Sequence, residues 1–221
     1  MLYTFQEGSG TTVQDMSGQT PLLPLTIYNP ANVTWLPGGG LSIDSATILY
    51  TTGAATKIIN AAQASNEITL EAWLQPANIT QDGPARIISL SQDTDERNFT
   101  LGQGLWSPNP PARFDIRLRT TATSNSGTPS LTSPNGTAST ALTHVVYTRD
   151  AAGNATIYVD GTAVAATTIS GDFSNWDTNF PLLLANEGTL NRPWLGELYL
   201  VAIYNQALTV AEVNQNFVAG P

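Results

Sequence analysis

Three arginines and an aspartate alternate along one short segment and could bind an anion. Residues 113–119 read Arg-Phe-Asp-Ile-Arg-Leu-Arg, so a strand here would present Phe114, Ile116 and Leu118 on one face. Its other face would present the charged side chains Arg113, Asp115, Arg117 and Arg119. Arginine forks bind carboxylates, sulfates or sugar hydroxyls through paired hydrogen bonds. The same row could instead pair with acidic side chains on neighbouring strands. The sequence leaves a ligand strip and ion pairing as equal alternatives.

Two tryptophans stand in polar loop segments and are candidate platforms for a sugar ring. Trp106 occurs in Gly-Leu-Trp-Ser-Pro and Trp176 in Phe-Ser-Asn-Trp-Asp. Ligand pockets often combine an aromatic surface with a few polar groups that fix the orientation of the ligand. Both side chains could also simply cap the end of a sandwich. The other three tryptophans lie beside apolar strand residues, and we expect them in the core.

Residues suited to catalysis are scarce. The chain has no cysteine and one histidine, His144, so thiol nucleophiles, Cys-ligated metals and multi-His centres are excluded. Glycosidases of the retaining type need two carboxylates about 5–5.5 Å apart, and no Glu-x-Asp-x-x-Glu strand occurs. His144 and Tyr147 stand at odd separation on one expected strand, so they face opposite sides and cannot form a lyase-like pair. We expect no enzyme, and we expect His144 and Glu71 to be structural hydrogen-bonding groups.

Charge and composition exclude several partners. The 221 residues include eight Lys and Arg against 17 Asp and Glu, a net charge of −9, with 41% hydrophobic residues. Nucleic acids and anionic membranes need a basic surface, which this chain lacks. No apolar run reaches the roughly 18 residues of a membrane span. The abundance of Thr, Asn, Gly and Ser is typical of exported bacterial proteins, so we expect a secreted or cell-surface location and a monomer.

Hydrophobic residues recur with a period of two, which indicates strands. The expected strands are 68–74, 86–90, 98–101, 113–119, 142–148, 155–159, 162–169, 182–184 and 195–204. Asp160-Gly161 predicts a two-residue hairpin turn. Helices are expected at 56–64 and after Thr209, where Glu212 completes a capping box, and 120–140 is expected to be a long loop. The pattern predicts a two-sheet antiparallel sandwich with a short C-terminal helix.

Several segments, in order along the chain, resemble laminin-G-like, concanavalin A-like domains. The segments that carry the resemblance are 3–10 with 15–18, Ile68–Pro76, Thr143–Asp150, Ile157–Gly161 and Gly196–Leu208. The resemblance implies a single jelly-roll domain over 1–221, with one concave sheet and loops gathered at a rim. The family includes lectins, carbohydrate-binding modules, adhesion domains and glycan-active enzymes, so the fold alone does not define the function.

The resemblance also implies a candidate calcium site. Pentraxins share this fold, and the positions that match their calcium loops are Asn98, with Asp93 and Asp95 nearby, and Glu187. Calcium takes 6–8 oxygen ligands, whereas this set offers only a few side chains. Calcium is therefore the one cofactor that the sequence raises, and Asp93, Asp95, Asn98 and Glu187 are its candidate ligands.

The leading hypothesis is a non-catalytic carbohydrate-binding, lectin-like module cut from a longer exported bacterial chain. It would bind a polysaccharide or other glycan on the concave sheet or loop rim through Trp106, Trp176 and the charged row at 113–119. The alternative is a protein-interaction or structural adhesion domain of a multidomain surface protein, in contact with other domains of its parent chain. A third hypothesis is a cryptic glycoside hydrolase or polysaccharide lyase.

Overall fold

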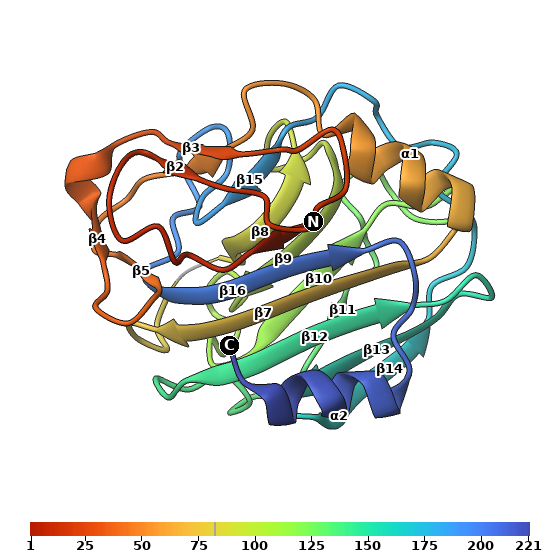
Figure 1. The fold of residues 1–221 in the computed structure, drawn as a ribbon. Coiled ribbons are helices and arrows are strands. Elements are labelled where there is room, and N and C mark those ends of the chain that lie inside the picture. Colours follow the sequence, from red (N-terminus) through yellow and green to blue (C-terminus); the bar gives the residue numbers. More distant parts are fainter. Residues whose placement is uncertain (82) are drawn as a thin grey trace.

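The protein, described here by a computed structural model covering residues 1–81 and 83–221, consists of two antiparallel sheets packed face to face (Figure 1). Sheet A has the order β14 (Thr162–Thr168), β13 (Asn154–Val159), β12 (Thr143–Arg149), β7 (Ile68–Pro76), β16 (Gly196–Tyr204), β5 (Leu41–Ile43) and β4 (Val33–Trp35), and β1 (Leu2–Tyr3) also pairs with β16. Sheet B has the order β11 (Leu131–Thr132), β10 (Phe114–Leu118), β9 (Arg97–Gln103), β8 (Ala85–Ser91), β15 (Leu182–Leu184), β6 (Leu49–Tyr50), β3 (Leu25–Ile27) and β2 (Thr12–Val13). The predicted two-sheet antiparallel sandwich is confirmed.

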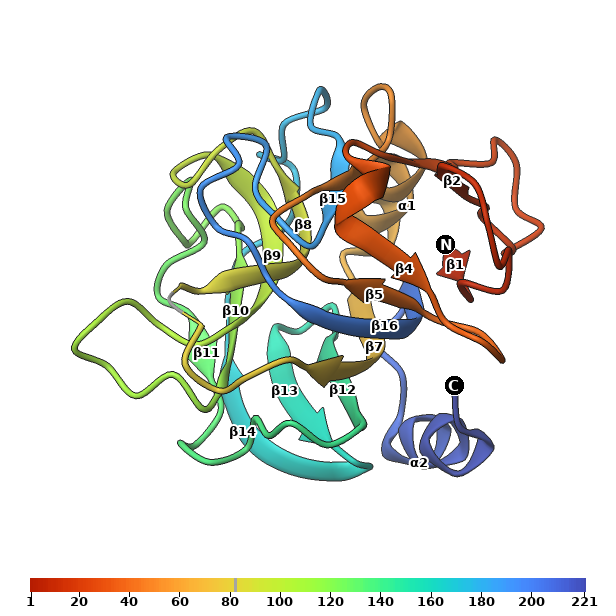
Figure 2. The same ribbon diagram turned by 90° about the vertical axis from the view of Figure 1, so that its left-hand side faces the viewer.

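Helices are few and short. α1 (Thr56–Ser65) places Ile58, Ile59 and Ala62 in the core, and α2 (Val210–Ala219) lies outside sheet A (Figure 2). A 3₁₀ turn, η1 (Pro30–Asn32), precedes β4. Among the described residues, neither α-helix is long or apolar enough to cross a membrane.

Local signals placed most elements correctly. Asp160 and Gly161 both have positive φ, 48° and 75°, as the hairpin between β13 and β14 requires. Thr209 accepts a hydrogen bond from the backbone of Glu212, whose own carboxylate accepts from the backbone of Thr209, so the capping box before α2 is confirmed. The segment 120–140 differs from the expected uninterrupted loop, because Leu131 and Thr132 pair with Ile116 and Asp115 as β11.

The two faces of the long central strands are buried for different reasons. In β7, Ile68, Leu70, Ala72 and Leu74 point into one apolar core cluster that includes residues of both sheets. The opposite face of β7 carries Thr69, Glu71 and Trp73, and it is buried as well. That burial follows from α2, because Phe217 stacks on Trp73 with ring centroids 5.8 Å apart.

Candidate functional site

Polar side chains gather on the face of sheet B that is turned away from the core. Ile88, Leu101 and Ile116 form one row across β8, β9 and β10 and belong to the core cluster. The neighbouring rows are Arg86, Gly102 and Asp115, and Ser89, Thr100 and Arg117. Because side chains alternate along strands, these polar rows occupy the opposite face. All five of their side chains are buried, so loops must cover them.

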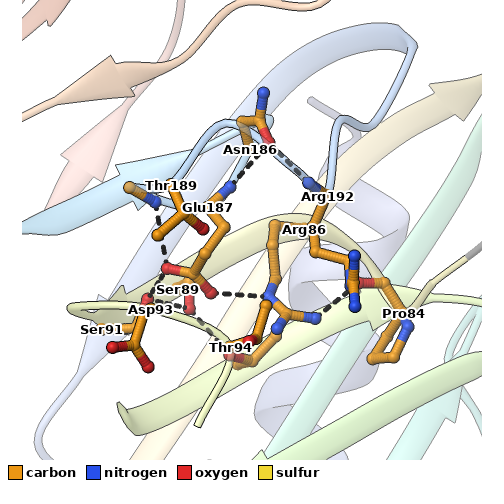
Figure 3. A network of polar contacts seen from close by, with 12 residues as sticks. Pro84, Arg86, Ser89, Ser91, Asp93, Thr94, Asn186, Glu187, Thr189 and Arg192 are labelled. Atoms are coloured by element: carbon orange, nitrogen blue, oxygen red, sulfur yellow. Dashed lines mark hydrogen bonds and ion pairs between the residues drawn. The ribbon is translucent and has the colours of Figure 1, made fainter. Parts of the chain in front are cut away.

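The best-connected part of this face is the ion pair between Arg86 and Glu187 (Figure 3). Arg86 Nε donates to Glu187 Oε2 at 2.9 Å, and Arg86 Nη1 donates to the carbonyl of Pro84. Ser91 Oγ and the backbone N–H of Gly188 donate to Glu187 Oε1. Burial lowers the pKa of Arg86, although Glu187 opposes the shift. Two segments thus meet here, since β8 supplies Arg86 and Ser91 while the loop after β15 supplies Glu187.

A cleft of 340 Å³ opens next to this ion pair. Its lining comes from β8, β10 and five loops: Pro84, Arg86, Thr94, Asp95, Trp106, Arg117, Ser126, Thr128 and Arg192. Trp106 on the β9–β10 loop is 52% exposed, and the Arg117 guanidinium lies 5.0 Å from its ring centroid. Arginine over an indole face is a favourable cation–π contact. The volume lies within the range of about 300–1,000 Å³ typical of ligand pockets.

The four side chains of the predicted charged row lie in different environments. Asp115 is fully buried and pairs with Arg117, with Nε 2.9 Å from Oδ2, along the same strand rather than across strands. Arg119 lies 3.5 Å from Glu96 of the β8–β9 loop. Arg113 precedes β10 and is half-buried. Ion pairing therefore holds for part of the row, and only Arg117 of the four lines the cleft.

The prediction that Trp176 is an exposed platform is wrong. The side chain is 4% exposed and packs on Phe173 and Phe99, with ring centroids 4.5 and 5.8 Å away. Its Nε1 donates to the backbone carbonyl of Arg119. The apolar ring is more stable in the core, because its one polar atom finds an acceptor there. The expectation of a buried side chain is confirmed for Trp73 and Trp194.

The predicted calcium ligands do not form a site that fits the ion. Glu187 is neutralised by Arg86, so a guanidinium takes the place that a cation would need. The amide of Asn98 hydrogen-bonds to both backbone groups of Asp177, and Asp93 Oδ1 accepts from the backbone of Asp95 and Glu96. Asp95 points to the cleft instead. Over residues 1–81 and 83–221, no three His, Cys, Asp or Glu side chains group as metal ligands would.

Glu71 and His144 have the structural role expected of them. His144 Nε2 lies 2.7 Å from Glu71 Oε1, while the other oxygen accepts from Tyr204 Oη at 2.8 Å and from Asn216 Nδ2 at 3.0 Å. This cluster lies under α2, whereas Tyr147 points into the core on the other face of β12. His144 and Tyr147 therefore cannot act on one substrate.

Sequence reasoning missed three further arginines of this region. Arg86 stands in the apolar run of β8, Arg97 opens β9, and Arg192 follows Glu187 in the same loop. A charged residue within an apolar strand was the only local signal for Arg86, because a buried charge needs a partner. Nothing in the sequence linked Arg86 to Glu187, which is 101 residues away.

Comparison with known proteins defines the class of this sandwich. A laminin G family model, described as the concanavalin A-like lectin/glucanases superfamily, matches residues 50–214. The chain therefore belongs to the concanavalin A-like lectin/glucanase superfamily. No curated protein matches the sequence.

Solved structures share the fold at low identity. The binding domain of botulinum neurotoxin DC, solved in complex with rat synaptotagmin II, is 13% identical with a TM-score of 0.70, over 99% of this chain and 51% of that one. The Trypanosoma rangeli sialidase, solved in complex with sialic acid, is 15% identical with a TM-score of 0.65, over 99% of this chain and 32% of that one. The chain thus spans about half of the toxin domain and a third of the sialidase.

Proposed function

We propose that this protein is a non-catalytic glycan-binding module whose binding site is the cleft lined by Trp106 and Arg117. The observation that carries the proposal is the half-exposed Trp106 ring beside a cleft of ligand size. The proposal places the module on an exported protein, in keeping with its composition.

The geometry around Trp106 suits a sugar ring. Arg117 covers part of the indole and leaves half of the side chain exposed to solvent. An exposed, immobilised aromatic ring offers an apolar face for the C–H groups of a pyranose. The ion pair with Asp115 holds Arg117, and through it Trp106, in position.

The rest of the lining supplies polar groups. Thr94, Ser126 and Thr128 bring hydroxyls, and Arg192 brings a guanidinium that donates to the carbonyl of Asn191. A few fixed polar groups around an aromatic surface are typical of ligand pockets. The superfamily includes lectins, and T. rangeli sialidase was solved with a bound sialic acid, so a glycan is the ligand class that the comparisons favour.

Fluorescence titration of wild type and Trp106→Ala against a glycan panel tests the proposal. Trp106 is the most exposed tryptophan, so a bound sugar ring should change the intrinsic emission. We expect Trp106→Ala to lose at least about tenfold in affinity, roughly 1.4 kcal/mol. EDTA and calcium arms show whether the metal contributes, and we expect equal affinities in both.

Tyr28→Ala provides the matched control, because Tyr28 is a 62% exposed aromatic outside the cleft. It should bind like wild type. Absence of binding to every glycan class, or equal affinities of Trp106→Ala and wild type, would reject the cleft as a glycan site.

A second candidate function is protein interaction along β14. This strand is the edge of sheet A, and its seven residues are uncharged and mostly exposed. Exposed edges with free N–H and C=O groups can accept another strand. Association that grows with concentration in ultracentrifugation, and that Ala166→Lys abolishes, would favour this function over glycan binding.

A further inference from the structure

Positive charge is concentrated around the cleft of an otherwise acidic protein. Four of the seven arginines, Arg86, Arg97, Arg117 and Arg192, lie in or behind it. Glu187 and Asp115 neutralise only two of them, Arg86 and Arg117. This region therefore has an excess of positive charge, whereas the whole chain carries a net charge of −9.

Arg97 is the member of this group without any partner. Its side chain is fully buried, and none of Nε, Nη1 or Nη2 has a hydrogen-bond partner among the described residues. A buried guanidinium without a counter-charge is costly and is normally paired. Burial, with further contributions from Arg86 and Arg117, lowers the pKa of Arg97 to about 9. The five N–H donors of Arg97 thus have no acceptor among the described residues.

Another buried arginine shows that this fold can satisfy such a group. Arg149 is also fully buried, but it donates to the carbonyls of Asn66, Ile169 and Gly171 and lies 4.8 Å from the ring centroid of Phe173. The contrast indicates that the free donors of Arg97 are not a general consequence of burial in this protein.

Arg97 does not line the cleft itself, but several residues that do line it act electrostatically on Arg97. A register shift between β8 and β9 pairs Arg97 with Ser91, whose hydroxyl binds Glu187. The charges that act on it are those of Arg86, Arg117, Glu187 and Asp95, and all of these except Glu187 line the cleft. Its backbone N–H donates to the carbonyl of Asn125 at 3.1 Å, which holds it against the loop carrying Ser126 and Thr128.

We propose that Arg97 is the anchor for an anionic group, a carboxylate or a sulfate, on the glycan that this cleft binds. The inference rests on the proposed function and adds the ligand class: an acidic rather than a neutral sugar. The anionic group accepts from the guanidinium fork, and Arg86, Arg117 and Arg192 add attraction. Asp95 is exposed at the mouth of the cleft, and its negative charge repels an anionic ligand.

Calorimetric titration with three tetrasaccharides tests the inference: a neutral glucan, an oligogalacturonate and a heparin fragment. We expect the wild type to bind one acidic tetrasaccharide at least tenfold more tightly than the neutral one. In Arg97→Met this ratio should fall towards one, and in Asp95→Asn the acidic ligand should bind several-fold more tightly. Both acidic tetrasaccharides carry carboxylates and only the heparin fragment carries sulfates, so a preference for the heparin fragment points to the sulfate.

Thermal stability separates a binding role from a structural role. Arg97→Met removes an unpartnered charge, so its melting temperature should equal or exceed that of wild type. Arg149→Met, the matched control, removes a satisfied network and should melt lower. A lower melting temperature of Arg97→Met, comparable to that of Arg149→Met, would overturn the inference and make Arg97 structural.

A second measurement uses the wild-type protein and does not depend on the folding of Arg97→Met. Sodium sulfate is titrated while the Nε–H signals of the arginines are followed by NMR, with the Arg97 signal assigned from Arg97→Lys. A saturable shift of that signal supports the anion site even if no glycan binds. Equal affinity for neutral and acidic tetrasaccharides would retain the glycan-binding function and reject the inference alone.

Discussion

Single side chains in this protein differ sharply in how well their polar atoms are satisfied. Glu187 accepts three hydrogen bonds in the interior, whereas Arg97 makes none with its guanidinium among the residues described. The hydroxyl of Tyr147 is a second such group, fully buried in the core without a hydrogen-bond partner in the described part of the chain. An unsatisfied polar group in the interior costs about 1–3 kcal/mol, so each of these positions has a measurable effect on stability or binding.

We predict that Tyr147→Phe stabilises the protein by about 1–3 kcal/mol at pH 7, because it removes an unsatisfied hydroxyl. Burial raises the pKa of the Tyr147 phenol, although Arg149 opposes the shift. Above pH 10 the unfolded wild type therefore ionises this phenol while the folded protein does not. The advantage of the variant should grow there by up to about 1.4 kcal/mol per pH unit.

Urea unfolding of both proteins from pH 7 to pH 11 measures this difference. Tyr204→Phe is the contrasting variant, since its hydroxyl donates to Glu71 at 2.8 Å and its loss should destabilise the fold. A Tyr147→Phe protein that is less stable than wild type at pH 7 would show that the hydroxyl has a partner.

At the scale of elements, the C-terminal helix completes sheet A. Two side chains of α2 contact the sheet: Asn216 donates a hydrogen bond to Glu71, and Phe217 stacks on Trp73. The capping box at Thr209 begins the helix without tertiary help, but ten residues are too few for a stable isolated helix. The helix therefore depends on the sheet for its stability, and the outer face of β7 and β12 depends on the helix for its burial.

We predict that Phe217→Ala lowers the free energy of unfolding by about 1–3 kcal/mol, because it removes the ring that stacks on Trp73 and His144. Val218→Ala is the matched control one residue later, where the side chain is 82% exposed, and it should change stability by less than about 0.5 kcal/mol. Chemical denaturation checks both. Equal effects of the two substitutions would mean that α2 does not dock as described.

For the whole molecule, the decisive feature is that one apolar cluster contains residues of both sheets and of α1. The inner faces of the two sheets share this cluster, so neither can lose that packing without exposing the other. The interpretation of residues 1–221 as one domain remains a prediction that this arrangement favours.

We predict a single cooperative unfolding transition. Trp176 and Trp194 both belong to the core cluster, so tryptophan emission reports on the interior while far-ultraviolet circular dichroism reports on the sheets. The two probes should give coincident urea midpoints. Two separate midpoints would show that part of the chain unfolds on its own and would contradict one domain.

The sequence by itself determined the local geometry. Alternation placed β7, β10 and β12 and their core faces, Asp160-Gly161 placed the hairpin, and Thr209 with Glu212 placed the start of α2. These features depend on residues only a few positions apart, so the local sequence pattern is sufficient to predict them. The charged row at 113–119 and Trp106 were also recognisable, because their residue types suit a ligand.

Only the tertiary structure decided which of these residues meet. Arg86 and Glu187 come together because β15 pairs with β8. No local sequence pattern predicts that strand pairing. The same contact made the predicted calcium ligand Glu187 the partner of an arginine. Trp176 is buried because Phe99 and Phe173 pack on it and the backbone of Arg119 accepts from it, contacts that join segments far apart in the chain. Burial and pairing of polar side chains depend on such long-range contacts, which is why Arg97 emerges only from the folded chain.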